Sequence, residues 1–181
     1  MDESVRGQLL IAGPTLLDPN FQRTVVLIIE HSPEGALGLV LNRPSESSVG
    51  EVVPELERVL EADSPVFVGG PVQPGGLIVL ARFDELDAAG LVSFEDVGIL
   101  RAEVSLEDPP PLLAARAFAG HSGWASGQLD YELERGDWIL EPATVEDAFT
   151  EDPETLWSAV LARKGGSYAL VARMPPDPSV N

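Results

Sequence analysis

The residues best suited to forming a functional site are concentrated between Phe118 and Trp138, in the stretch FAGHSGWASGQLDYELERGDW. This stretch, called the Gly/Trp block below, holds two tryptophans, one of the two histidines of the chain and several glycines. Glycines interleaved with large aromatic residues indicate that the backbone approaches something closely, either another strand or a ligand. Such a block therefore indicates a binding site. It would indicate a catalytic site only if nucleophiles or acid–base groups accompanied it.

Standard catalytic and cofactor motifs are missing from the sequence. Gly120-His-Ser122-Gly-Trp124 approaches the Gly-x-Ser-x-Gly form of a nucleophile elbow, but Trp124 stands where the last glycine is needed. We interpret Ser122 as a hydroxyl that satisfies the backbone in a tight turn, not as a nucleophile paired with His121. Neither a phosphate-binding loop with its Gly-Lys-Ser/Thr ending nor a Gly-x-Gly-x-x-Gly fingerprint is present.

Metal ligands are also scarce. The chain has no cysteine and neither the His-x-x-Glu-His nor the EF-hand spacing, so neither a metal nor another cofactor is expected. His31 and His121 both lie near expected strand ends beside glycines and could meet in space. The simpler expectation is that each hydrogen-bonds a loop.

Two other glycine-bearing elements could join the Gly/Trp block in a groove. They are Gly35–Gly38 with the following Asn42-Arg43, and Gly69-Gly70-Pro71. Glycines at strand ends can leave a groove lined by backbone N–H groups, where an anion or a carboxylate could lie. The alternative is that the glycines permit turns and close strand packing, while the tryptophans belong to the core. The candidate groove residues are Asn42, Arg43, Gly69, Gly70, Pro71, His121, Gly123, Trp124, Gly127 and Gln128, with Arg23 as a further polar group.

Length and composition bound the fold. A chain of 181 residues, 44% hydrophobic and 23% charged, is typical of one globular domain, here residues 1–181 with a proline-rich tail at 174–181. No apolar run approaches the ~20 residues that span a bilayer. The opening MDESVRGQ is unlike a secretory signal. We expect a soluble cytoplasmic protein without membrane attachment.

The net charge of −19 argues against nucleic acid as a partner. A DNA-binding surface gathers Lys and Arg to neutralise phosphates, whereas the eleven basic residues here, a single lysine among them, are scattered from Arg6 to Arg173. Acidic residues crowd the ranges 51–63, 84–87 and 141–154. Such charge confers solubility or, less simply, an acidic binding face. The expected partner is a protein or a small molecule.

Apolar patterning predicts many strands. The unbroken β-branched run Thr24–Glu30 is typical of a strand covered on both faces, and a short Pro/Gly turn joins it to Ala36–Leu41 in an antiparallel hairpin. Further strands are expected at Gln8–Ala12, Pro65–Val68, Leu77–Arg82, Gly98–Val104, Trp138–Glu141 and Tyr168–Val171.

Four helices are expected among these strands. Ser48-x-x-Glu51 is a capping box, and Pro54 should break that segment and begin a second helix. Ser126 is expected to cap a helix over 127–135 that Gly136 ends. A last helix should begin at Asp152-Pro153 and bury Leu156, Trp157, Val160 and Leu161. The expected fold class is α+β, a single domain with a largely antiparallel mixed sheet.

Several separated stretches resemble the YqgE/AlgH family of bacterial proteins. In order they are GQLLIAGPTLLDPNFQRTVVLIIEH, GALGLVLNRP, VFVGGPV, the Gly/Trp block, TLW and the terminal PSVN, and together they span residues 7–181. The resemblance implies a single α+β domain built on coiled, partly bifurcated sheets with peripheral helices. It implies no established activity, although the family carries a transcriptional-regulator label. This chain has His121-Ser122 where the family has a Tyr-Ala pair.

Two functions from different classes remain. The first is a non-catalytic regulatory or binding module that does not contact DNA directly. The alternative is an enzyme, for example a hydrolase, that uses carboxylates with Arg43 or a histidine in a groove near the Gly/Trp block. Paired carboxylates in a cleft would favour the enzyme, whereas a groove lined by apolar and backbone groups would favour binding.

Overall fold

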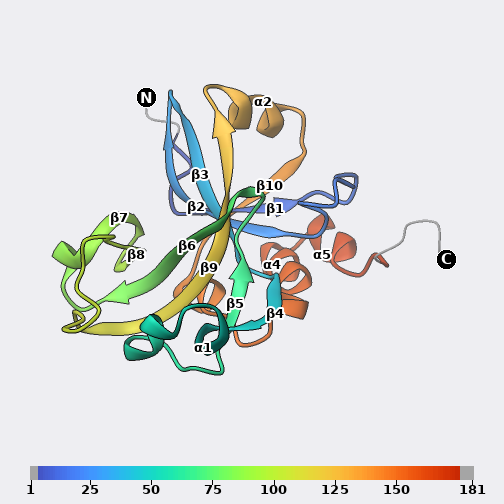
Figure 1. Cartoon of the computed structure of the whole chain (residues 1–181). Coiled ribbons are helices and arrows are strands. Elements are labelled where there is room, and N and C mark those ends of the chain that lie inside the picture. The colour runs from blue at the N-terminus through green and yellow to red at the C-terminus, as the bar shows by residue number, and fades with distance from the viewer. Residues whose placement is uncertain (1–3, 176–181) are drawn as a thin grey trace.

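The computed structural model describes residues 4–175, which form one continuous sheet with helices at its periphery (Figure 1). The strand order is β10-β1-β2-β3-β9-β6-β8-β7, and β5 pairs with both β4 and β9. The strands are β1 (Gln8–Ala12), β2 (Val25–Ser32), β3 (Gly35–Val40), β4 (Pro44–Ser48), β5 (Pro65–Val68), β6 (Val72–Phe83), β7 (Ala89–Phe94), β8 (Val97–Leu100), β9 (Leu112–Ala125) and β10 (Trp138–Pro142). The helices are α1 (Val49–Val52), α2 (Gln128–Glu134), α3 (Val145–Ala148), α4 (Leu156–Lys164) and α5 (Ser167–Val171), with short 3₁₀ helices η1 (Pro54–Arg58), η2 (Leu86–Ala88) and η3 (Pro153–Thr155).

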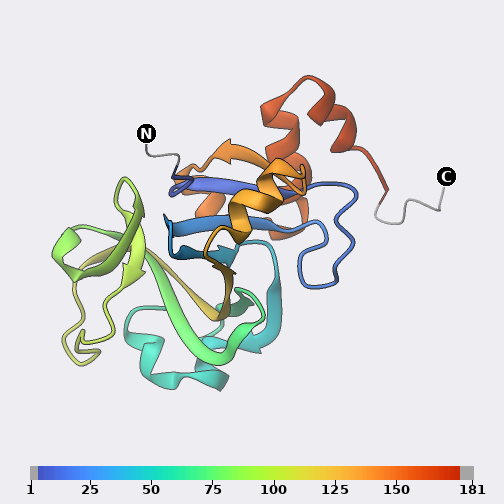
Figure 2. The same ribbon diagram turned by 90° about the horizontal axis from the view of Figure 1, so that it is seen from above.

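Antiparallel pairing predominates, and β5 with β9 is the parallel pair. This arrangement of a mostly antiparallel sheet and peripheral helices confirms the α+β class. In Figures 1 and 2, β7 and β8 lie at one side of the molecule and α4 and α5 at the other. None of the helices within residues 4–175 combines the length and apolar character that crossing a membrane requires.

Strand β2 lies at the centre of one half of the sheet, between β1 and β3. Its side chains alternate between two apolar clusters, so that Val26 and Ile28 face one and Leu27 and Ile29 the other, all fully buried. Helix α4 covers the second cluster, while α2 and the loop at residues 13–24 cover the first. The predicted central strand and its antiparallel neighbour are therefore confirmed.

Strand β9 connects the two halves of the sheet (Figure 1). Its first residues pair with β6, and its last residues, Ser122–Ala125, pair with β3. Gly120 lies at the transition with a φ of +72°, a left-handed conformation that favours glycine. The Gly/Trp block is thus the end of a long strand followed by a helix, and the sheet forks where this strand changes partners.

The helix predictions are confirmed at α1, η1 and α4. The Ser48 hydroxyl accepts from the Glu51 N–H, and Pro54 begins η1. Helix α4 buries the four apolar residues expected of it. Such segments are predictable because their capping residues and apolar spacing act within a few residues.

The predicted cap of α2 is wrong, whereas its predicted end is right. Gly127 is the N-cap residue, and the Ser126 hydroxyl donates instead to the Pro33 carbonyl at 2.6 Å. Gly136 follows the helix with a φ of +80°, and the Asp137 N–H donates to the Glu132 carbonyl. Together with the bond from the Gly136 N–H to the Leu133 carbonyl, this bond forms the Schellman motif that ends many helices.

Other element predictions are also wrong. The segment Tyr168–Val171 belongs to helix α5, because Tyr168, Val171 and Ala172 reach the core at helical spacing. Strands β4 and β7 were not expected, and β6 begins at Val72 and not at Leu77, with an irregular register between these two residues. Strand β8 is shorter than predicted and ends at Leu100. The predicted tail lies outside the described residues from position 176 onward.

Candidate functional site

The glycine motifs meet where the β5–β6 connection crosses β9. A Cβ atom on Gly70 would lie 2.3 Å from the carbonyl carbon and oxygen of His121, and one on Gly120 would lie 2.4 Å from the Gly70 oxygen. A Cβ on Gly69 would equally lie 2.4 Å from the Gly120 oxygen. No side chain fits at these positions, since such separations are far below van der Waals contact. The glycines therefore serve close packing of two backbones.

Ser122 completes this crossing. Its buried hydroxyl donates to the Gly69 carbonyl at 3.1 Å. The hydroxyl therefore satisfies the backbone as expected, although it does so from within β9 and not from a tight turn.

Asn42 and Arg43 anchor the β1–β2 loop, residues 13–24. The Asn42 amide donates to the Arg23 carbonyl at 2.9 Å and accepts from the Val25 N–H at 3.0 Å. The Arg43 guanidinium donates to the carbonyls of Asn20 (2.8 Å) and Gln22 (3.0 Å). Burial lowers the pKa of Arg43 and the carboxylate of Asp18 counteracts this, so the guanidinium stays charged at neutral pH.

Phe21 lies in the β1–β2 loop between Asn20 and Gln22, whose carbonyls accept from Arg43, and its side chain contacts the Gly/Trp block. Its ring meets that of Trp138 edge-on at 5.6 Å between centroids and lies 6.3 Å from that of Trp124. The two tryptophans also meet edge-on, at 6.2 Å. Edge-to-face contacts of this kind contribute about 0.5–1.5 kcal/mol each beyond burial. Both motifs thus hold the same loop.

Glu132 of α2 fixes the two indoles. Its Oε1 accepts from Trp124 Nε1 at 3.2 Å and from Trp138 Nε1 at 3.0 Å, and its Oε2 accepts from the Gln128 amide at 3.0 Å. Gln128 in turn accepts from the Ala125 N–H. Because the bonds occupy both carboxylate oxygens, Glu132 is a structural acceptor in this arrangement.

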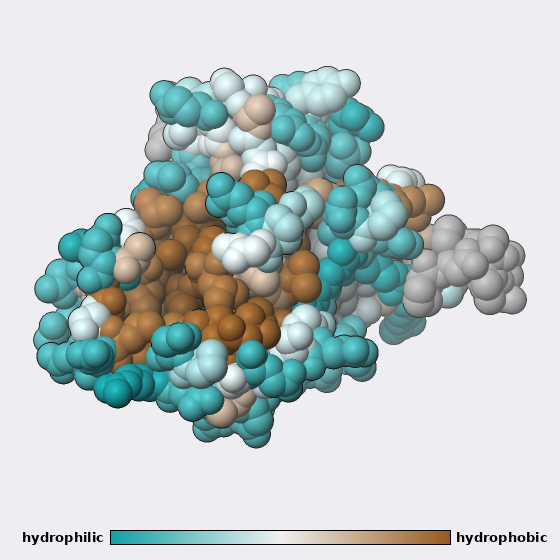
Figure 3. Space-filling view, viewed as in Figure 1, coloured by the Kyte–Doolittle hydropathy of each residue, from teal (hydrophilic) through white to brown (hydrophobic). Residues whose placement is uncertain are grey.

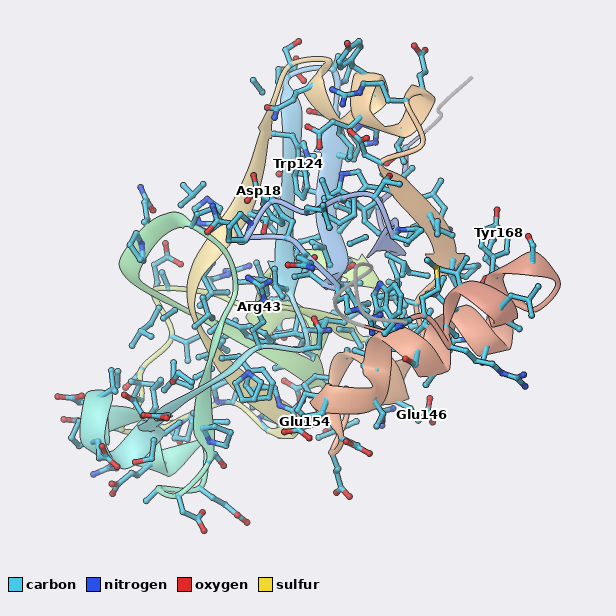
Figure 4. All side chains as sticks on the ribbon, turned by 90° about the vertical axis from the view of Figure 1, so that its right-hand side faces the viewer. Asp18, Arg43, Trp124, Glu146, Glu154 and Tyr168 are labelled. Carbon is cyan, nitrogen blue, oxygen red and sulfur yellow. The ribbon has the colours of Figure 1, made fainter. Side chains whose placement is uncertain are left out.

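An open groove of about 440 Å³ lies between the β1–β2 loop and α2, where Figure 4 shows Asp18 and Trp124. Its apolar surface comes from Leu16, Phe21 and the edges of two indoles, and its rim carries three carboxylates with one arginine. Asp137 lies 3.7 Å from Arg135, whose guanidinium also faces the ring of Tyr131. The lining residues are Leu16, Asp18, Phe21, Gly123, Trp124, Gln128, Tyr131, Glu132, Arg135, Asp137 and Trp138.

The structure distributes the predicted site residues over two cavities on either side of the β1–β2 loop. Gly123, Trp124 and Gln128 line the groove. Arg43, Gly70 and Pro71 line a smaller hollow of about 60 Å³ that also contains Asn20.

The remaining predicted residues support these cavities. Asn42 holds the β1–β2 loop through the Arg23 carbonyl, and Gly69 packs against the Gly120 backbone. Gly127 is the left-handed residue that precedes α2. His121 faces Val72 across the β6–β9 ladder. Arg23 donates to the Met174 carbonyl and lies over the Trp157 ring, away from the groove lining.

Sequence reasoning did not assign Phe21, Tyr131, Glu132 or Asp18 to the site. The helical spacing of Gln128 and Glu132 was an available signal, since residues four apart share one face of a helix. Phe21 lies in an irregular loop without periodicity, and nothing local indicates its contact with residues about a hundred positions away.

The two histidines have separate surroundings. His31 accepts from the Val5 N–H at its Nδ1, and its Nε2 lies 3.3 Å from an Asp130 oxygen. Burial lowers the pKa of His121, which favours its neutral form. Within residues 4–175, no three His, Asp or Glu side chains gather in a way that could hold a metal ion.

Comparison with known proteins gives a consistent result. A family model described as AlgH-like matches residues 9–169. The chain is 44% identical to a UPF0301 protein of Thermobifida fusca, covering 98% of this chain and 96% of the relative. It is 38% identical to UPF0301 protein CT0663 of Chlorobaculum tepidum, covering 97% and 95%.

Two solved structures have the same fold. The crystal structure of protein DIP2367 from Corynebacterium diphtheriae matches with a TM-score of 0.82 and 29% identity, over 94% of this chain and 93% of that one. The solution structure of the AlgH protein from Pseudomonas aeruginosa matches with a TM-score of 0.71 and 29% identity, over 97% and 96%.

Proposed function

Because this chain belongs to the AlgH-like family, with relatives and solved structures that match it over nearly their whole length, we propose that it is a non-catalytic binding module. Its ligand or partner segment occupies the groove between the β1–β2 loop and α2. The observation that carries this proposal is the aromatic groove itself, around which residues from β9, β10, α2 and the β1–β2 loop are held by specific hydrogen bonds.

The lining of the groove favours a positively charged group. Three carboxylates and one arginine leave the rim negative, and Phe21, Tyr131 and the two indoles contribute aromatic surface to the lining. A ligand that carries an ammonium or guanidinium group next to an apolar portion fits both features. Net attraction also brings such a ligand to a protein of charge −19.

The charged side chains that an enzyme would use in or beside this groove are engaged in structural contacts. Arg43 donates to two backbone carbonyls, and Glu132 accepts from two indoles and an amide. Asp137 is paired with Arg135. Groups committed to holding the fold cannot exchange protons or bind a reacting atom without disrupting it, so we favour binding over catalysis.

The transcriptional-regulator label of the family is compatible with this proposal if regulation is indirect. Regulation would pass through the bound ligand or through a protein partner, because no cluster of basic residues is available for phosphate contacts in the sequence. The cysteine-free chain needs no oxidising compartment, and we place this module in the cytoplasm.

The indole N–H resonances provide a direct test. Tetramethylammonium and an alkylguanidinium ion are titrated into the protein, with an alkylsulfonate as the anionic control. The cations should shift the Trp124 and Trp138 indole signals saturably. The Trp157 signal should stay constant, because this indole donates to the Ala12 carbonyl outside the groove.

Charge variants separate the groove from general electrostatics. Asp18→Asn should weaken cation binding, because Asp18 lines the groove and asparagine keeps the oxygen that accepts from the Asn20 N–H. Glu154→Gln in η3 removes the same charge outside the lining and should leave binding unchanged. Equal responses to cation and anion, or equal effects of the two variants, would refute the proposal.

A further inference from the structure

The sheet face formed by β5, β6 and β9 carries apolar side chains that the molecule covers only in part, since Val79 and Ala117 are buried whereas Val68 and Leu77 are exposed. Figure 3 shows them as a continuous hydrophobic area with a hollow at its centre and hydrophilic residues around it. On β5 and β6, Val68 is 42% exposed and Leu77 is 36% exposed. Large residues of this kind are normally buried in soluble proteins when they adjoin one another.

The strand register explains why these side chains share one face. Leu77 lies opposite Ala119, and Val79 opposite Ala117, while Val68 also pairs with Ala119. Directly paired residues project to the same side of a sheet. We call this surface the alanine face, and its residues are Val68, Leu77, Val79, Ala115, Ala117 and Ala119.

Small side chains make the alanine face concave. The three alanines of β9 form a low floor, and two walls rise beside it. One wall is η1 with its flanking residues, and the other comes from β8 and the segment that follows it. The wall residues Val53, Val59, Leu100 and Leu106 are only partly buried although they pack in the same cluster. The cluster is therefore an apolar core that remains open on one side.

The walls of the alanine face are strongly acidic. Residues 51–63 and 101–111 together carry eight carboxylates and two arginines. One of those arginines, Arg58, is engaged with the Glu107 carbonyl at 3.2 Å, a bond that ties the two walls together. Glu51, Glu55 and Glu57 on α1 and η1 are exposed. An apolar floor thus lies inside a negative rim.

We propose that the alanine face docks a basic amphipathic segment of a protein partner, with apolar residues on the floor and Lys or Arg side chains against the rim. The complementary charge selects this occupant. A second copy of the chain would bring one acidic rim against another, and anionic lipids or nucleic acids would be repelled. Apolar anchors with a charged periphery are the usual arrangement of protein interfaces.

Designed peptides test this proposal with the full chain. The probe is an 18-residue peptide of leucine and lysine whose leucines occupy one face of a helix. A scrambled peptide of equal composition and a leucine–glutamate counterpart are the controls. We expect saturable binding of the probe, at least about tenfold tighter than that of the scrambled peptide, which corresponds to ~1.4 kcal/mol. Amide signals of Val68, Leu77 and Ala119 should shift, and Leu77→Glu should reduce these shifts while leaving any response of the Trp124 and Trp138 indole signals unchanged.

Three variants distinguish docking from attraction between opposite charges. Leu77→Glu adds a negative charge, which would strengthen purely electrostatic binding of the cationic probe. Because it also removes an apolar contact, we expect it to weaken binding about tenfold. Glu55→Lys on the rim should weaken binding more than Glu154→Lys, which makes the same charge change in η3.

Several outcomes would overturn the proposal. They are tighter binding by Leu77→Glu, equal effects of the two lysine variants, and equal affinity for the scrambled peptide. Sedimentation equilibrium of the protein alone gives a further one. A dimer that Leu77→Glu dissociates would assign the alanine face to a second copy of the chain.

Discussion

At the scale of single residues, the glycines of the β9 crossing act through the Cβ atom they lack. Gly69, Gly70 and Gly120 bring two backbones within a distance that no other residue permits. The same contact positions Gly70 and Pro71 in the hollow beside Arg43. A glycine signature that suggested a ligand thus has a complete structural explanation at this point.

Gly70→Ala should destabilise the protein by about 2 kcal/mol or more, because the new methyl group would overlap the His121 carbonyl and force the strands apart. Gly75→Ala in β6 is the matched control, since its Cβ would meet nothing within 4 Å, and it should change stability by less than about 0.5 kcal/mol. Urea denaturation of the three proteins measures both effects. A loss at Gly70 no larger than at Gly75 would show that the crossing is more adaptable than its geometry indicates.

His121 should make the folded state sensitive to mild acid. Burial lowers its pKa in the folded protein below the unfolded value of about 6.5, so the unfolded chain binds the proton more readily. Stability is therefore present above pH ~6.5 and declines as the pH falls toward the folded pKa. His121→Gln should lose less stability than the parent between pH 7.5 and 5, as urea denaturation at each pH would measure. The many carboxylates titrate in both proteins, so an identical pH dependence would exclude a contribution from His121.

At the scale of elements, α4 protects the exposed edge of the sheet. The Lys164 ammonium donates to the Leu140 carbonyl at 2.7 Å, and Arg163 donates to the Pro142 carbonyl at 3.2 Å. These carbonyls lie on β10, the terminal strand in the sheet order. Unpaired edge carbonyls invite association with other strands, and cationic side chains are one way in which proteins block it.

Arg163→Ala should destabilise the protein by about 1–3 kcal/mol. Both Nη atoms of Arg163 lie 2.9 Å from the carboxylate of Asp147, whose side chain is 6% exposed, so the variant leaves a buried charge without its partner. The loss is smaller than for a fully buried pair because the guanidinium is partly exposed. Thermal unfolding measures the change, and Asp147→Ala should cost less in the Arg163→Ala background than in the parent, because it then removes only the cap of α3 at the Thr144 N–H and not the ion pair. Additive losses in the double variant would contradict this coupling.

At the scale of the whole molecule, the positive charges are dispersed, and most of them are engaged by carboxylates or backbone carbonyls. Arg6, Arg82 and Arg135 each pair with a neighbouring carboxylate, and Arg163 with two. Arg23, Arg43 and Arg116 donate to backbone carbonyls in different parts of the fold. Arginines held in this way contribute little free positive potential, while the net charge remains −19.

The purified protein is therefore expected not to bind duplex DNA at about 150 mM salt. Each phosphate contact needs a basic group, and a polyanion is repelled by the net charge. A mobility-shift titration is the measurement, with the range of about 10⁻⁴ to 10⁻⁶ M, typical of non-specific binders, as the reference. Sequence-selective binding tighter than this range would restore direct transcriptional control as a function.

Local patterns in the sequence determined the elements whose burial is regular. The segment Thr24–Glu30 indicates a doubly buried strand because every residue from Thr24 to Ile29 is apolar or β-branched. Helix α4 is predictable from its apolar spacing and from Pro153, which begins the preceding η3. The Gly/Trp block was recognisable as a focus of the fold for the same reason, since its composition is unusual over a short span. The order of the expected elements indicated the α+β class, the family resemblance implied the same class, and the fold confirms it.

The tertiary structure alone decided which distant segments meet. It joined Arg43 to the carbonyls around Phe21 and placed Phe21 against Trp124 and Trp138. It also made Tyr168–Val171 helical and left the alanine face open. Side-chain periodicity records only whether a residue is buried and on which side of its own element. The identity of the neighbour depends on contacts between positions far apart in the chain, which no local pattern encodes.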